Sequence, residues 1–158
     1  MGLSVENRSQ ARQVAVQALY DYTHFESNND LDQALDFALE SGHFPDQGYD
    51  EVANDYLYLL LNGVVDHLSE IDAHIEKYLK NWTLARIARI DLNILRVAFF
   101  ELLYMDKEDV PARVTVDEAI ELSKFFSDDK SRQFINGVLA TAINDLGQNQ
   151  DQDEAKLK

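Results

Sequence analysis

Two arginines near the amino terminus are spaced so that they share one edge of a helix. Arg8 and Arg12 are four residues apart, and apolar residues recur every three or four positions from Ala11 onward. We therefore expect a helix over residues 7–24 with both guanidinium groups on an exposed edge near its start. A cation at a helix N-terminus opposes the macrodipole and costs roughly 0.3–1 kcal/mol. An external anion explains two such cations better than helix stability does.

A second group of residues with ligand chemistry lies between positions 67 and 74. These are two histidines and two carboxylates: His67, Glu70, Asp72 and His74. A metal site can be imagined there, but the chain has neither an H-E-x-x-H motif nor the paired Glu-x-x-His motifs of di-iron bundles, nor a phosphate-binding glycine loop. Histidines on polar helices more often face solvent, so we expect no enzyme, no metal site and no cofactor.

The charges are distributed unevenly along the chain. A net charge of −15 by itself argues against nucleic acid as a partner. Residues 13–76 hold 14 acidic residues and no Lys or Arg, whereas residues 77–132 hold 10 bases and 10 acids. The pattern is compatible with an acidic surface that only keeps the protein in solution. It is also compatible with a basic face that attracts an anionic partner and is separated from an acidic face that repels it.

The most apolar stretch, residues 84–105, is expected to form the central helix. Its apolar residues fall on all sides of a helix, which is typical of a buried one. Charged residues spread through it exclude a membrane span. None of them has an opposite charge three or four positions away within the stretch, so each must meet another helix, a partner or water. They are Arg86, Arg89, Asp91, Arg96 and Glu101.

Apolar periodicity predicts an all-α fold of about seven helices packed around this central one. The other helices are expected over residues 31–41, 49–66, 69–79, 115–126 and 129–146. Thr115 and Glu118 have the spacing of a capping box, and Ser127-Asp128-Asp129 is a second start signal. The polar tail, residues 148–158, is predicted to be disordered.

An Asn-Gly pair recurs inside predicted helices in both halves of the chain, at Gly63 and Gly137. Glycine in a helix costs about 1 kcal/mol relative to alanine, so we expect each to mark the close approach of another helix. The recurrence predicts one domain, residues 1–147, with two small helical subdomains over about residues 7–80 and 84–147. The absence of cysteine and the polar amino-terminal segment favour a cytoplasmic protein without membrane contact.

Several sequence blocks resemble the NusB family of bacterial transcription antitermination factors, and they occur in the family's order over residues 8–146. They are AR at 11–12, AVQALY at 15–20, RID at 89–91, ILRVA at 94–98, EL at 101–102, DVP at 109–111, DEAIELSK at 117–124 and FINGVL at 134–139. The resemblance implies an all-α fold of two helical subdomains and an RNA-binding adaptor without catalysis. An acidic helical protein-interaction module without direct RNA binding remains the alternative.

The resemblance also implies partners. NusB proteins pair with NusE, a small-subunit ribosomal protein, and the pair binds single-stranded boxA RNA in nascent ribosomal RNA transcripts, which connects it indirectly to the RNA polymerase antitermination complex. The NusE-facing residues implied here are Tyr20, Arg86, Arg89 and Asp91. We expect Asp91 either to pair with a cation from another helix or to reach the surface and meet the basic partner.

An RNA adaptor needs cations for phosphates and flat or amide side chains for unstacked bases. The residues that could supply them are Arg8, Arg12, Gln17, Lys130, Arg132, Gln133 and Phe134. We expect the two arginines at one helix start and the Lys130 and Arg132 pair at another to form one patch. Phe134 is also spaced to be a core residue with Val138.

Overall fold

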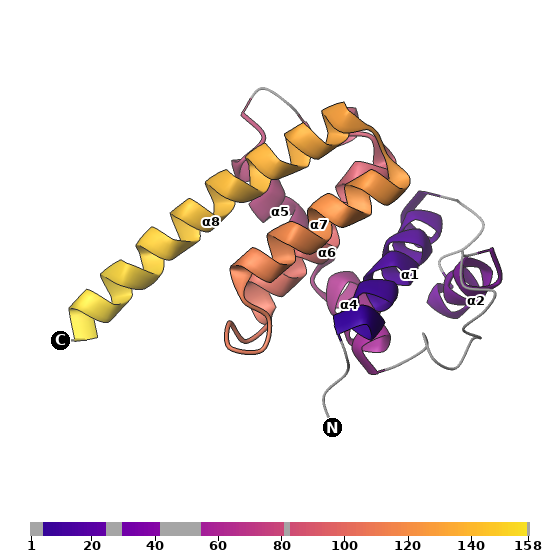
Figure 1. Ribbon diagram of the computed structural model, residues 1–158, viewed down its shortest axis with the longest axis horizontal. Coiled ribbons are helices and arrows are strands. Elements are labelled where there is room, and N and C mark those ends of the chain that lie inside the picture. Colours follow the sequence, from indigo (N-terminus) through magenta and orange to yellow (C-terminus); the bar gives the residue numbers. More distant parts are fainter. Residues whose placement is uncertain (1–4, 25–29, 42–54, 81–82, 158) are drawn as a thin grey trace.

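Helices are the only regular secondary structure in the described part of the chain, as predicted. The computed structural model describes residues 5–24, 30–41, 55–80 and 83–157 (Figure 1). In these residues the elements are α1 (Val5–His24), α2 (Leu31–Ser41), α4 (Asp55–Asp66), α5 (Leu68–Lys77), a 3₁₀ helix (Leu84–Arg86), α6 (Arg89–Tyr104), α7 (Ala112–Phe126) and α8 (Asp129–Leu157). Of the helix expected over 49–66, the first residues lie outside the described ranges. None of the described helices is long and apolar enough to cross a membrane.

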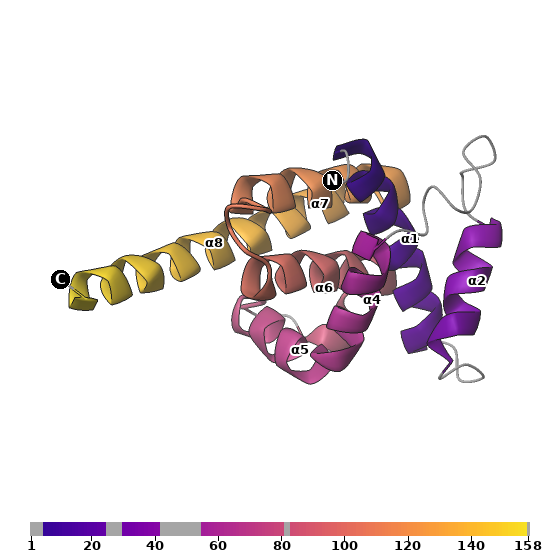
Figure 2. The ribbon, with the colours of Figure 1, turned by 90° about the horizontal axis from the view of Figure 1, so that it is seen from below.

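Helix α6 is the central element, which confirms the expectation of a buried helix. Every residue from 91 to 102 is buried, on all sides of the helix. It contacts α1, α4, α5, α7 and α8, and Figure 2 shows it between α7 and α5. Buried apolar side chains from all the described α-helices join one cluster, so both halves of the chain share a core. The division into two subdomains stays a prediction.

Three helix boundaries differ from the predictions. The central helix begins at Arg89 rather than at residue 84, because Ile87 and Ala88 are extended and separate it from the 3₁₀ turn. Helix α7 begins directly after Pro111, whose fixed φ suits a helix start, so the capping box at Thr115 is wrong. Helix α8 continues past Gly147 to Leu157, and the tail predicted to be disordered is helical, since one glycine costs a helix only about 1 kcal/mol.

The start signal at Ser127-Asp128-Asp129 is confirmed. Oδ1 of Asp128 accepts a hydrogen bond from the Ser131 amide at 2.9 Å, which satisfies one of the free N–H groups at the start of α8. This hydrogen bond lowers the pKa of the Asp128 carboxyl. Asp30 caps α2 in the same way through the amides of Asp32 and Gln33, at 3.0 and 3.3 Å.

The two glycines of the Asn-Gly pairs have different environments. A Cβ atom on Gly63 would lie 2.3 Å from Cζ of Phe100, so α4 and α6 approach each other closely there, as predicted. A Cβ atom on Gly137 would have nothing within 4 Å, so the same expectation is wrong for that residue. Periodicity identifies a glycine inside a helix, but it does not say which side of the helix faces another element.

We predict that Gly63→Ala destabilises the protein although alanine is the better helix former. The new methyl group meets the buried Phe100 ring, and overpacking of this kind costs about 1–3 kcal/mol. Gly137→Ala is the matched control and should raise stability by up to about 1 kcal/mol. Urea unfolding followed by circular dichroism measures both. Equal effects at the two positions would contradict the close packing of α4 on α6.

Candidate nucleic-acid interface

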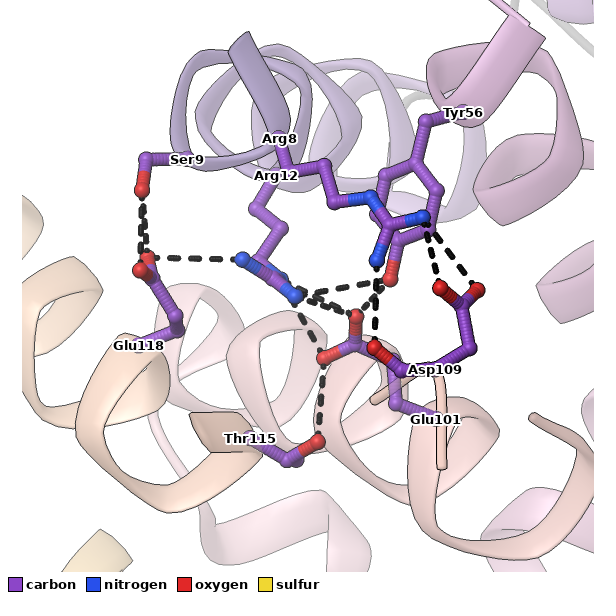
Figure 3. Close-up of polar contacts among 8 residues, drawn as sticks. All are labelled: Arg8, Ser9, Arg12, Tyr56, Glu101, Asp109, Thr115 and Glu118. Atoms are coloured by element: carbon purple, nitrogen blue, oxygen red, sulfur yellow. Dashed lines mark hydrogen bonds and ion pairs between the residues drawn. The ribbon is translucent and has the colours of Figure 1, made fainter. Parts of the chain in front are cut away.

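Arg12 is buried, and this corrects the expectation that it shares an exposed edge with Arg8. Only 2% of its surface is exposed. Its Nε and Nη2 donate hydrogen bonds to Oε2 of Glu101 at 3.0 and 2.8 Å, and its Nη1 lies 3.6 Å from Oε2 of Glu118 (Figure 3). The reason is that the start of α1 packs on α6 and α7, so this edge faces carboxylates instead of solvent.

Glu101 also accepts hydrogen bonds from two hydroxyl groups. The Tyr56 hydroxyl from α4 and the Thr115 hydroxyl from α7, at 3.3 Å, both donate to its carboxylate. Burial and the Glu101 charge raise the pKa of the Tyr56 phenol, which therefore keeps its proton to donate. Burial is the largest single influence on the pKa of Arg12 and would lower it, but the charge and hydrogen bonds of Glu101, together with Tyr56 and Glu118, outweigh burial and raise that pKa. Four helices thus meet at one buried carboxylate.

Arg8 lies at the edge of this network and is paired as well. Its Nη2 donates to both carboxylate oxygens of Asp109, at 3.1 and 3.2 Å, and its guanidinium lies 4.7 Å from the centre of the Tyr56 ring. The Arg8 side chain is 21% exposed. A phosphate can therefore reach Arg8 only in competition with Asp109.

We predict that Arg12 acts on stability rather than on RNA contact. Glu101→Gln and Arg12→Met should each cost about 3–5 kcal/mol, because each leaves a buried charge without its partner. The double variant should cost clearly less than the sum of the two single variants. Chemical denaturation of all four proteins gives the coupling energy. An Arg12→Met variant of unchanged stability would show that the guanidinium is solvent-exposed in solution.

A second group of candidate residues gathers where α6 and α8 begin. We call the space between them the α6–α8 hollow; it has a volume of about 290 Å³. Its lining includes Arg86 and Asp91, which were expected to face NusE, together with Lys130 and Phe134, which were expected to contact RNA. Arg86 and Lys130 are exposed and Phe134 is half-buried. Nearby on α8, Arg132 pairs with Asp129 at 2.6 Å, and Gln133 is exposed.

Asp91 in this hollow has neither of the environments expected for it. It is only 4% exposed, and its two oxygens accept hydrogen bonds from the hydroxyls of Ser127 and Ser131, at 3.0 and 2.7 Å. It lies in the first turn of α6, where the helix dipole favours a negative charge. Two serine hydroxyls and the N-terminal end of α6 thus stabilise the Asp91 carboxylate without a cation. These hydrogen bonds also connect α6 to the start of α8.

A third group surrounds a cleft of about 670 Å³ between α1, α2, α6 and α7, which we call the aromatic cleft. It brings together Gln17 and Tyr20 of α1 with Arg89 of α6. Its other walls include Phe37 and Phe126, which the sequence analysis did not single out. Phe37 is 58% exposed. The sequence did contain a signal for Phe37. It lies off the apolar face of α2, where an aromatic side chain cannot enter the core.

Arg8 does not form one patch with the Lys130 and Arg132 pair, which corrects that expectation. Arg8 binds Asp109 in the loop after α6, whereas Lys130 lies beside Asp91 at the beginning of α6. The 16 residues of α6 separate these two ends by about 24 Å. Gln17 and Tyr20 lie nearer the α8 group, because they share a cleft with Arg89 at the start of α6.

Three of the four candidate metal ligands on α5 and beside it, His67, Glu70 and Asp72, have other partners. Nδ1 of His67 lies 3.4 Å from Glu70, and its ring stacks on Tyr104 with 4.2 Å between centroids. Asp72 binds Arg96 of α6, with Oδ1 and Nε 2.9 Å apart. Within the described residues, no three His, Cys, Asp or Glu side chains are grouped so that they could hold a metal ion.

Comparisons with known proteins agree with this fold. The NusB family model matches residues 9–144. The chain is 59% identical to the transcription antitermination protein NusB of Levilactobacillus brevis over 58% of this chain, a segment that spans 63% of that relative's length. It is 42% identical to NusB of Geobacter sp. (strain M21), over 84% of this chain and 90% of that one. The solved structure of T. maritima NusB superposes with a TM-score of 0.72 and 30% identity, covering 91% of this chain and 93% of that one. With this fold and these matches, the chain belongs to the NusB family, whose curated relatives are transcription antitermination proteins.

Proposed function

We propose that this protein is an RNA-binding adaptor in transcription antitermination, which pairs with NusE and binds single-stranded boxA RNA in nascent ribosomal RNA transcripts. Through that pair it joins the antitermination complex of RNA polymerase. The observation that carries the proposal is the α6–α8 hollow, where two exposed cations flank a half-buried aromatic ring on an otherwise acidic protein. Family membership supports the identity of the RNA and of the protein partner.

The chemistry of the α6–α8 hollow suits a single-stranded nucleotide. Arg86 and Lys130 can neutralise phosphates from two sides, and the ring of Phe134 offers a surface on which a base can stack. Helix α6 begins without a side-chain cap at Ala88, and helix N-termini attract anions. Beyond this hollow, Gln133 is exposed on α8, and its amide can bind the base edge of a neighbouring nucleotide.

The aromatic cleft suits a protein partner. Its volume of about 670 Å³ and its exposed Phe37 leave apolar surface uncovered beside Tyr20. Asp21 lines the cleft and Asp32 is exposed on α2, so the surroundings complement a basic ribosomal protein. NusE docked in this cleft would contact Arg89, next in sequence to Ala88 of the α6–α8 hollow. A protein partner and an RNA would then touch each other at the start of α6, as an adaptor requires.

The main test is the salt dependence of RNA binding. Lys130→Ala and Arg132→Ala should each weaken binding to all RNA sequences about equally and reduce the slope of log K against log salt by about 0.7. Fluorescence anisotropy with labelled single-stranded boxA RNA, NusE present, measures the slope. Lys124→Ala is the matched control, because Lys124 forms a similar pair with Glu121 on α7. An unchanged slope in the double variant would favour the alternative, an acidic protein-interaction module without RNA contact.

A second test concerns Arg8. We predict that Asp109→Asn raises RNA affinity by up to about fivefold, since an exposed ion pair of this kind is worth at most about 1 kcal/mol. The double variant Arg8→Ala/Asp109→Asn should lose this gain, and the same titrations measure both. A gain that persists without Arg8 would mean that Asp109 repels RNA by its charge alone.

A further inference from the structure

Gly137 is a helical glycine that the packing of the protein does not require. It lies in the interior of α8, is exposed, and a Cβ atom there would meet nothing within 4 Å. At Gly63, in contrast, the ring of Phe100 fills the space that a side chain would take. Glycine is also used where a ligand approaches the backbone closely. The open space beside Gly137 would therefore let a ligand lie directly against the backbone of α8.

That space is a second hollow, which we call the α5–α8 hollow. It has a volume of about 390 Å³ and lies between the end of α5 and α8. Lys80 and Tyr78 line it from the α5 side, and Gln133, Gly137 and Thr141 line it from α8. Its volume falls within the range of about 300–1,000 Å³ that is usual for small-ligand pockets.

The polar groups of the α5–α8 hollow divide into satisfied and available ones. The Thr141 hydroxyl donates to the carbonyl of Gly137 at 3.0 Å, and the Tyr78 hydroxyl donates to Asp145 at 2.7 Å. Lys80 and Gln133 are exposed. Lys80 has a φ of 56°, a left-handed conformation that is costly for a residue with a side chain and is often found at functional sites. The ammonium group of Lys80 and the amide of Gln133 are thus exposed polar groups that this hollow presents to a ligand.

Phe134 connects the two hollows, because it lines both the α6–α8 hollow and the α5–α8 hollow. Around them stand three exposed cations, Arg86, Lys130 and Lys80. Among the described residues that line the two hollows, the one carboxylate is Asp91, whose two oxygens already accept hydrogen bonds from serines. Connected hollows with cations along them and an aromatic ring between them fit successive nucleotides better than a protein segment.

We propose that the α5–α8 hollow binds one further nucleotide of the single-stranded RNA, adjacent to the nucleotide held in the α6–α8 hollow. Lys80 contacts its phosphate, Gln133 contacts its base, and Gly137 lets the nucleotide lie against the backbone of α8. The inference rests on the proposed function and extends it, because it assigns Lys80 and Gly137 to the RNA path and sets a minimum length for the RNA.

The test fills the α5–α8 hollow without disturbing the fold. Gly137→Leu places a side chain in the hollow, and Gly147→Leu is the matched control on the same helix, where a Cβ atom also meets nothing within 4 Å. Neither variant should lower the melting temperature. Binding is measured by anisotropy with boxA RNAs shortened one nucleotide at a time from each end, NusE being present.

The wild-type protein should lose at least about fivefold in affinity at the step that removes the nucleotide from the α5–α8 hollow. Gly137→Leu should bind the long RNA at least about fivefold more weakly and should show no such step, whereas Gly147→Leu should behave like wild type. Lys80→Gln should reduce the salt slope by about 0.7 with the long RNA and leave it unchanged with the RNA shortened past the step.

Three results would overturn the inference. A Gly137→Leu variant with the wild-type affinities and the wild-type step shows that the α5–α8 hollow takes no RNA, while the proposed function stands. A Gly137→Leu variant that no longer binds NusE but keeps the affinity step with shortened RNAs assigns the α5–α8 hollow to the protein partner. A wild-type pair that binds no boxA RNA at any length refutes the proposed function itself and the inference with it.

Discussion

The buried carboxylate of Glu101 is the interaction on which the arrangement of the helices depends. It lies on the central helix and receives hydrogen bonds from Arg12 of α1, Tyr56 of α4 and Thr115 of α7. A charge this deeply buried is tolerated only when it is paired and hydrogen-bonded. Its partners come from both halves of the chain, so the network fixes how α1 crosses α6 and α7. That crossing places Tyr20 beside Arg89 and thereby shapes the aromatic cleft.

Local signals in the sequence predicted most of the helices. The start of α8 at Asp128 was identified because the capping bond involves only neighbouring residues. The apolar stretch containing α6 was recognised because its apolar residues cover every side of the helix. The capping box predicted at Thr115 was wrong because α7 begins directly after Pro111, so Thr115 lies inside the helix. The fixed φ of proline favours a helix start at that point.

The errors in the candidate site have a common physical cause. Helical spacing tells which side chains share an edge but not whether that edge meets solvent, so Arg12 was placed at the surface. The unpaired Glu101 in the apolar helix, together with Ala11 and Ala15 around Arg12, was the available signal that the two belong together. For Asp91, either a cation from another helix or a position at the surface was expected, where two serine hydroxyls suffice. Contacts between residues far apart in sequence decide such cases, and a single sequence does not show them.

The connection between Arg12 and Glu101 spans 89 residues of sequence, and Glu118 lies farther along still. A ribosome adds about 5–20 residues per second, so a newly made α1 waits roughly 5 to 20 seconds before all its carboxylate partners have been synthesised. During that interval both arginines are free cations on a growing chain. The acidic residues that follow them, from Asp21 to Glu76, emerge first and are the counter-charges at hand. Synthesis from the amino terminus therefore delivers these acidic residues before the carboxylate against which Arg12 is buried.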